Sequence, residues 1–128
     1  LSLHSEVVHV QHLEAGEGIG YGSTYITPEP MTIATIPIGY ADGYPRSLSN
    51  RGTVLIQGTR CPVVGRICMD QFMVAVPDTI TVKPGDKVVL LGSQGHESIS
   101  ALEIAALAST IPYEIFCGFS DRVPRQYI

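Results

Sequence analysis

The stretch Val82-Lys83-Pro84-Gly85-Asp86-Lys87-Val88 indicates the fold class more clearly than any other part of the chain. A Pro-Gly pair forms a tight turn, and the residues after it begin a new strand. The same arrangement recurs in many small β-barrels and carries no information about function. It predicts a mainly all-β protein built as a small β-barrel.

The rest of the chain agrees with this interpretation. Short runs rich in Val, Ile and Thr, followed by two final apolar segments, predict strands at Leu1–Leu13, Thr32–Ile38, Thr53–Ile56, Cys61–Cys68, Phe72–Val76, Lys87–Leu91, Tyr113–Gly118 and Val123–Ile128. Turn signals such as Ala41-Asp42-Gly43 and Asn50-Arg51-Gly52 separate these runs. Many short strands with frequent turns are typical of a barrel or a sandwich.

One stretch breaks the β pattern. Ser100 and Glu103 have the spacing of a capping box, in which a side chain caps the start of a helix and a glutamate follows three residues later. The apolar segment 104–108 then continues as a helix, which we expect Pro112 to end. The sequence therefore predicts one short helix in a β-rich domain.

The composition fits a compact domain whose surface is partly covered. Its 128 residues correspond to one domain over residues 1–128. Apolar residues make up 45% and charged residues only 16%, so we expect part of the surface to be covered by another element. The net charge is −4 and the Lys and Arg residues are scattered, which argues against nucleic-acid binding.

The sequence favours a cytoplasmic location. His4 and Glu6 interrupt the start, which therefore does not resemble a signal peptide, and no apolar run reaches the ~20 residues that cross a bilayer. The chain begins without Met, as though it were cut from a longer protein. The chain has three cysteines, Cys61, Cys68 and Cys117. A small, odd number of cysteines does not make a disulfide framework, which favours reduced thiols.

The histidines give little support to a metal site. His4, His9 and His12 lie close in sequence, but on a strand His4 and His12 face one side and His9 faces the other. A structural zinc site needs four converging ligands, and the sequence has no Cys-x-x-Cys pair. We therefore expect no bound metal.

A glycine-rich segment surrounds Tyr21. Gly16, Gly18, Gly20 and Gly22 occur at every second position, a pattern that matches neither the dinucleotide fingerprint nor the phosphate-binding P-loop. Glycines at this period leave one face of the backbone bare, so we expect another part of the protein to approach it closely. Tyr21 is a candidate functional residue, although a simple turn between strands explains the pattern as well.

Two further segments place polar groups beside apolar strands. Pro37–Arg46 is a turn that bears two tyrosines, and Gly65–Gln71 contains an arginine and an aspartate. Charged residues next to a strand form either a pocket or an ion pair. The structural alternative is an ion pair of Arg46 or Arg66 with Asp42 or Asp70.

Together these segments resemble the successive motifs of the bacterial alanine racemase family. The matching stretches are Leu1–Val7, Gly20-Tyr21-Gly22, Pro37-Ile38-Gly39-Tyr40-Ala41-Asp42-Gly43, Gly65-Arg66-Ile67-Cys68-Met69-Asp70-Gln71 and Arg122-Val123-Pro124-Arg125. They stand in the family's order and at its spacings, and they cover essentially the whole chain. Each motif alone is weak evidence, but their combination is specific.

The resemblance implies a two-part enzyme. The family has an N-terminal (β/α)8 barrel, which carries pyridoxal 5′-phosphate (PLP) on a lysine, and a C-terminal β-domain that this chain resembles. The enzyme is a homodimer in which the barrel of one subunit and the β-domain of the other form each active site. The implied reaction is the interconversion of L- and D-alanine, for D-amino-acid supply to peptidoglycan in the bacterial cytoplasm.

The family's motifs also imply roles for individual residues. Tyr21 matches the tyrosine that acts as the base on the L-face of the substrate. Met69 matches the methionine whose backbone N–H binds the substrate carboxylate, and Tyr40 matches a tyrosine at the substrate entrance. The residues expected in the entrance corridor are Arg46, Arg66 and Asp70.

One position departs from the family's pattern. A tyrosine usually precedes Arg-Val-Pro-Arg at the inner gate of the substrate pocket, whereas this chain has Asp121. A carboxylate there opens the gate and makes it more polar, so serine is an alternative substrate, as in the serine-racemising relatives. Such relatives can carry a membrane domain, which leaves a membrane tether in the parent protein open. Local drift with alanine as the substrate is the interpretation that we favour.

The chain by itself lacks part of the implied chemistry. Its lysines, Lys83 and Lys87, lie beside a Pro-Gly turn, whereas a Schiff-base lysine needs a buried cofactor pocket. We therefore expect the isolated domain to fold, to be inactive and to expose an apolar face. Two alternatives are the β-domain of a PLP-dependent basic amino-acid decarboxylase and a non-catalytic dimerisation or binding barrel. The motifs around Tyr21, Tyr40 and Met69 argue against both.

Overall fold

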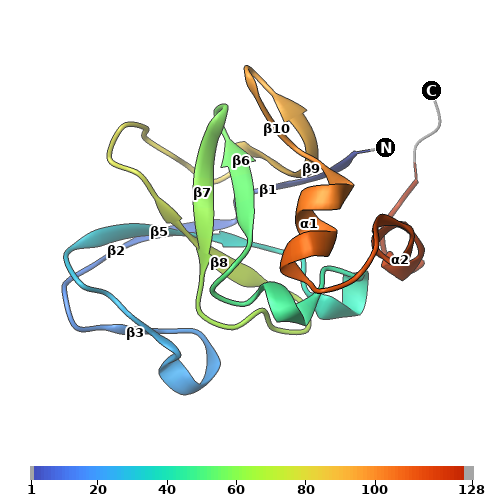
Figure 1. The fold of residues 1–128 in the computed structure, drawn as a ribbon. Coiled ribbons are helices and arrows are strands. Elements are labelled where there is room, and N and C mark those ends of the chain that lie inside the picture. The colour runs from blue at the N-terminus through green and yellow to red at the C-terminus, as the bar shows by residue number, and fades with distance from the viewer. Residues whose placement is uncertain (1, 126–128) are drawn as a thin grey trace.

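The computed structural model describes residues 2–125, except for the side chain of Tyr21, and it confirms the mainly β fold (Figure 1). One antiparallel sheet has the strand order β1-β9-β6-β7-β8-β5-β2, with β10 paired to β9, and β3 and β4 form a separate small hairpin. The strands are β1 Leu3–Glu6, β2 His9–Leu13, β3 Gly18–Ile19, β4 Tyr25–Ile26, β5 Met31–Ile36, β6 Thr53–Ile56, β7 Thr59–Val64, β8 Phe72–Val76, β9 Lys87–Gln94 and β10 Glu97–Ile99.

Val7 and Val8 connect the two ends of this strand order. The N–H of Val7 donates to the carbonyl of Asp86 (2.9 Å), and the carbonyl of Val7 accepts from the N–H of Gly85 (2.8 Å). The N–H of Val8 donates to the carbonyl of Thr35 (3.1 Å) on β5. The sheet therefore curls into a barrel-like shape, and the predicted Pro-Gly turn lies where the curl closes.

The predicted strands agree with the structure to different degrees. Those at Thr53–Ile56 and Phe72–Val76 are confirmed with the same bounds. The single strand predicted over residues 1–13 is wrong, because the crossing at Val7 and Val8 divides it into β1 and β2. The strand predicted to end at Cys68 ends at Val64 in the structure, as β7. The reason is that Gly65 has a left-handed φ of 81°, which a strand cannot continue.

The helix predicted after Ser100 is confirmed as α1, Ala101–Leu107, with the Ser100 hydroxyl accepting from the N–H of Glu103 at 3.0 Å. However, Pro112 begins a second helix, α2 (Pro112–Gly118), so the strand predicted over 113–118 is wrong. Proline suits the first position of a helix, where its missing N–H removes no hydrogen bond. Residues 2–125 thus contain two α-helices instead of one.

The last predicted strand, over 123–128, is only partly within the described residues. Residues 123–125 do not form a strand, and residues 126–128 lie outside the description. Between residues 2 and 125 no single helix is long and apolar enough to cross a membrane. Only α1 and α2 taken together, with a 96° bend between them, reach that length and composition.

The hydrophobic core fills the inside of the curled sheet. The rings of Tyr44 and Phe72 stack there with centroids 4.9 Å apart and an angle of 15° between their planes. Complete burial raises the pKa of the Tyr44 phenol, because the charged form loses its hydration. α1 adds Ile104 and Ala105 to the same cluster, which explains why this helix packs on the sheet.

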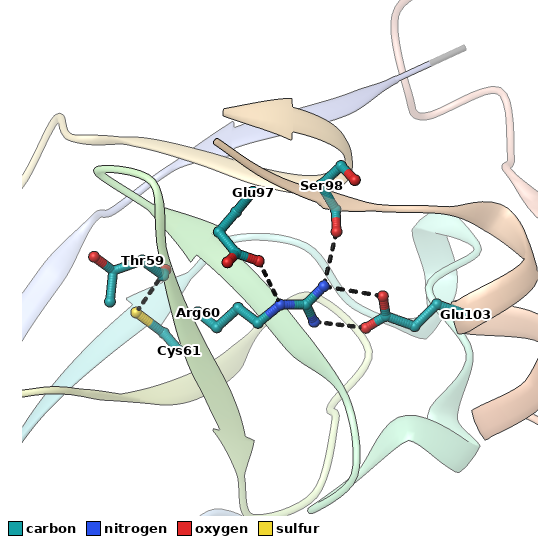
Figure 2. A network of polar contacts seen from close by, with 6 residues as sticks. All are labelled: Thr59, Arg60, Cys61, Glu97, Ser98 and Glu103. Carbon is teal, nitrogen blue, oxygen red and sulfur yellow. Dashed lines mark hydrogen bonds and ion pairs between the residues drawn. The ribbon is translucent and has the colours of Figure 1, made fainter. Parts of the chain in front are cut away.

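Arg60 joins three elements on the outside of the sheet (Figure 2). Its Nε lies 2.9 Å from Glu97 on β10, and its Nη1 lies 2.8 Å from the carboxylate of Glu103 on α1. Its Nη2 also donates to the carbonyl of Ser98 at 2.8 Å. The carboxylate of Glu103 is therefore bonded to Arg60. Of the predicted capping box, the bond from the Glu103 N–H to the Ser100 hydroxyl forms.

We expect Arg60→Met to lower the free energy of unfolding of the chain by about 1 kcal/mol, because a half-exposed network of charged hydrogen bonds contributes little more than this. Arg60→Lys should recover part of the loss, since an ammonium group cannot bind Glu103 with two parallel bonds. Urea unfolding followed by circular dichroism measures both changes. Arg51→Met, at an exposed arginine outside this network, is the control, and an equal loss in the control would contradict the prediction.

Candidate active site

Four predicted site residues line one pocket of about 290 Å3: Tyr40, Arg46, Arg66 and Met69, together with Ile67 and Cys68. They come from two segments that are distant in sequence, the turn after β5 and the loop between β7 and β8. The sheet register explains why these segments meet, because Ile36 at the end of β5 pairs with Phe72 at the start of β8.

Backbone hydrogen bonds join the two segments. The N–H of Tyr40 donates to the carbonyl of Cys68 (3.0 Å), and the N–H of Ala41 donates to the carbonyl of Met69 (3.1 Å). A Cβ atom on Gly39 would overlap the carbonyl oxygens of Cys68 and Met69, so this close approach requires glycine. The Gly-Tyr-Ala-Asp-Gly motif is thus the half of the pocket wall that docks on the Cys-Met-Asp-Gln motif.

The turn that carries Tyr40 is closed by Asp42. The Asp42 carboxylate accepts from the N–H of Gly39 at 2.9 Å, and the side chain of Asp42 is nearly buried. This turn leaves Tyr40 47% exposed while Tyr44, four residues later, enters the core. The guanidinium of Arg46 lies 5.9 Å from the centre of the Tyr40 ring, within the range of a cation–π contact.

The backbone N–H of Met69 points to a role in binding. Within residues 2–125 it donates to no protein acceptor, although the neighbouring Cys68 N–H donates to Gln71 (2.9 Å). The side chain of Met69 is 51% exposed. Together with the guanidinium groups of Arg46 and Arg66, this donor makes the pocket suitable for a small anion such as a carboxylate.

Asp70 and Asp42 are bound by Arg122, which the sequence did not suggest. The Nη2 of Arg122 lies 2.6 Å from the Asp70 carboxylate, and its Nε lies 3.4 Å from that of Asp42. The ion pairs proposed from the sequence, with Arg46 or Arg66 as the cation, are therefore replaced by one arginine from the C-terminal segment. Asp70 lies at the edge of the pocket and does not line it.

The segment that contains Tyr21 lies against the Arg66 wall of this pocket. Residues Tyr21–Ser23 form a short 3-10 helix, η1, between β3 and β4. A Cβ on Gly20 would stand 3.1 Å from the backbone nitrogen of Arg66, and a Cβ on Gly22 would stand 3.3 Å from its Nη1. The glycines therefore permit the close approach that the sequence suggested. The predicted role of the Tyr21 side chain lies outside the described part of the structure.

Asp121 and the lysines are not among the residues that line the pocket. Asp121 is exposed and is not among the residues that line it. Lys83 and Lys87 are exposed as well, and Lys87 lines a different surface hollow beside His4. A lysine that holds PLP needs a buried pocket, so the lysines of this chain do not fit that function. Among residues 2–125, no group of three His, Cys, Asp or Glu side chains is arranged to hold a metal ion.

Comparisons with known proteins agree with this arrangement. The family model described as "Alanine racemase, C-terminal domain" matches residues 1–127. The alanine racemase of Symbiobacterium thermophilum is 60% identical over 127 residues, which are 99% of this chain and 34% of that protein. That of Halothermothrix orenii is 52% identical over the same shares of the two chains.

Solved structures show the same relation. The crystal structure of alanine racemase from E. faecalis superposes with a TM-score of 0.94 at 48% identity, covering 99% of this chain and 33% of that one. The structure from Bacillus anthracis with bound L-Ala-P gives a TM-score of 0.94 at 49% identity, over 99% of this chain and 32% of that one. This chain thus spans about a third of the length of these relatives. It belongs to the alanine racemase family, as its C-terminal domain.

Proposed function

We propose that this chain is the C-terminal domain of a PLP-dependent racemase that interconverts L- and D-alanine. The observation that carries the proposal is the convergence of Tyr40, Met69 and Arg66 in one pocket, with the Tyr21 segment against its wall. The relatives reported above are named alanine racemase, which does not favour the serine alternative. The related structure from Bartonella henselae is described with covalently bound pyridoxal phosphate.

PLP would be held by the part of the full protein that precedes this chain, because Lys83 and Lys87 are exposed and lie outside the pocket. When bound, PLP supplies the electron sink that makes the α-proton of an amino acid removable. The residues of this chain then have two tasks. They hold the substrate carboxylate, and they move a proton on one face of the substrate.

The carboxylate would bind at the Met69 N–H. The substrate carboxylate is an anion, and the nearby guanidinium groups of Arg46 and Arg66 produce a positive potential at the pocket entrance. Tyr40 lies beside this entrance, with Arg46 above its ring. These contacts orient the substrate before any bond is broken, which lowers the entropic part of the barrier.

Tyr21 would be the base on the L-face. An ordinary tyrosine has a pKa of ~10, so only ~0.1% is phenolate at neutral pH, and lowering the pKa to ~7 needs about 4 kcal/mol of preferential stabilisation of the anion. Neighbouring cations can supply this stabilisation. Arg66, whose guanidinium lies against Gly22, supports the proposal because it places positive charge beside the same backbone.

The open pocket supports a shared site. Tyr40 and Met69 leave about half of their surfaces exposed, although they line the pocket. A barrel domain, from the partner subunit of a homodimer, would cover these side chains and bring PLP to Tyr21. In a bacterial cytoplasm the product D-alanine would serve peptidoglycan synthesis.

We expect the isolated chain to show no racemisation of L-alanine with PLP present, because it has no lysine in a buried pocket. Addition of the separately produced N-terminal part should restore activity, and addition of the same N-terminal part without this chain should not. Circular dichroism of the isolated chain controls for folding. Racemisation by the isolated chain, measured by polarimetry, would contradict the division of labour proposed above.

Tyr21→Phe in the full-length holoenzyme should slow racemisation by roughly 10²-fold or more, because the variant lacks the proton-transferring hydroxyl. Both directions must slow equally in kcat/KM, since the two enantiomers have the same free energy. The informative measurement is therefore the exchange of the α-proton with D2O. The α-proton of L-alanine should no longer exchange with D2O. The α-proton of D-alanine should still exchange, with retention of configuration, through the base on the opposite face.

The control for this variant is Tyr25→Phe, which removes a phenol that contacts Met31 outside the pocket. It should leave both exchange rates within about twofold of wild type. Equal loss of exchange from L- and D-alanine in Tyr21→Phe, with the PLP absorbance intact, would overturn the assignment of Tyr21 to the L-face.

Asp121→Tyr tests the substrate. Since Asp121 is exposed and does not line the pocket, we expect the variant to change the ratio of kcat/KM for alanine and serine by less than about threefold. The wild-type enzyme should prefer alanine. Comparable wild-type activity on the two amino acids, lost for serine alone in Asp121→Tyr, would instead support the serine alternative.

A further inference from the structure

Asn50 bonds to two other segments around the candidate site. Its Oδ1 accepts from the N–H of Gly65 at 2.6 Å, directly before Arg66. Its Nδ2 donates to the hydroxyl of Thr24 at 3.1 Å, directly after the η1 helix that contains Tyr21. Its own N–H donates to the carbonyl of Gly65 at 3.2 Å. Both ends of the amide are thus satisfied by segments that are distant in sequence.

The backbone of Asn50 is arranged for this contact. Its φ of 58° lies in the left-handed region, which asparagine tolerates better than most residues and glycine tolerates without strain. The preceding η3 helix, Arg46–Leu48, carries Arg46, which also lines the pocket. Asn50 therefore links the segment after Arg46, the end of β7 and the Tyr21 segment.

The Tyr21 segment lies within a short hairpin. The hairpin on either side of it contains two residue pairs, Gly18 with Ile26 and Ile19 with Tyr25. Gly20 and Gly22 both have left-handed φ angles, and a glycine backbone is the most adaptable of all. The bond from Asn50 to Thr24 joins this hairpin to the strand end that carries Arg66.

We propose that Asn50 is a positioning residue for the L-face base: it holds the Tyr21 segment against Gly65 and Arg66. This inference rests on the proposed racemase function. Small displacements of a reacting group have large kinetic effects, since a shift of about 1 Å costs on the order of 10²-fold in rate. Loss of a single hydrogen bond in an exposed network should loosen the segment and slow proton removal by roughly threefold to tenfold.

The test uses the full-length holoenzyme and two variants that share the Asn50–Thr24 bond, of which Asn50→Gly also removes the bond to the Gly65 N–H. Asn50→Gly removes the amide and keeps the left-handed backbone free of strain. Thr24→Val removes the accepting hydroxyl and keeps the shape, and Thr24→Ser restores the hydroxyl. The matched control is Thr32→Val, which removes a similar hydroxyl bonded to His12 at 2.8 Å.

We expect Asn50→Gly and Thr24→Val to slow the exchange of the α-proton of L-alanine by roughly threefold to tenfold. D-alanine exchange with retention should stay near wild type, as should both rates in Thr24→Ser and Thr32→Val. The double variant should lose less than the product of the single losses, because Asn50→Gly already breaks the bond that Thr24→Val removes.

A second measurement follows the segment itself. Hydrogen–deuterium exchange detected by mass spectrometry should show faster exchange of the backbone amides of residues 20–24 in Asn50→Gly and Thr24→Val than in Thr32→Val. A purely structural role would instead lower the thermal midpoint, slow both α-proton exchange rates together and raise amide exchange throughout the domain, which would overturn the proposal.

The outcomes separate this inference from the proposed function. If Tyr21→Phe retains L-alanine exchange, the proposed role of Tyr21 fails, and the positioning role fails with it. If Tyr21→Phe abolishes that exchange while Asn50→Gly and Thr24→Val behave like Thr32→Val, the positioning role alone is overturned.

Discussion

The hydrogen bonds at Val7 and Val8 are the constraint on which the rest of the structure depends. At Val7 the chain pairs with the Gly85-Asp86 turn, and one residue later it pairs with Thr35 on the other side of the sheet. The crossing therefore makes β1 and β2, the two ends of the strand order, consecutive parts of one stretch of chain. The crossing curls the sheet around a core that reaches from Val7 to Phe72.

The curl also determines where the candidate site forms. β8 lies between β5 and β7, so the segments that leave β5 and β7 emerge on the same side. There the carbonyls of Cys68 and Met69 accept the N–H groups of Tyr40 and Ala41. A single register in the sheet therefore builds one pocket from two motifs that are almost thirty residues apart.

Local sequence patterns predicted the parts of the fold that depend on local physics. Thr53–Ile56 and Phe72–Val76 are short apolar runs between turns, and Ser100 is a helix cap whatever its surroundings. The break at Val7 could not be predicted in this way, because its cause is a pairing with residues almost eighty positions later. The prediction at Pro112 was wrong for another reason. Proline both follows helices and begins them, and the apolar residues after Pro112 suit a strand as well as a helix.

The site shows the same division between local and distant causes. Motif order identified Tyr40, Arg66 and Met69, since each stands in a recognisable stretch. It did not identify the partner of Asp42 and Asp70, because Arg122 reaches both only after α2 has returned the chain to the Gly43 turn, where the N–H of Ser120 donates to the carbonyl of Asp42 at 3.0 Å.

In the racemase proposed above, this domain would carry half of a catalytic site with walls that are already formed. The pocket walls are held by bonds within the domain: Gly39 against Cys68, Asp42 to Arg122, and Asn50 to Gly65. In that proposed enzyme the other half would not need to shape these walls, and it would supply the cofactor and cover Tyr40 and Met69. A pre-formed wall loses little conformational freedom when the two halves meet, which favours an accurate placement of the proton-transferring groups.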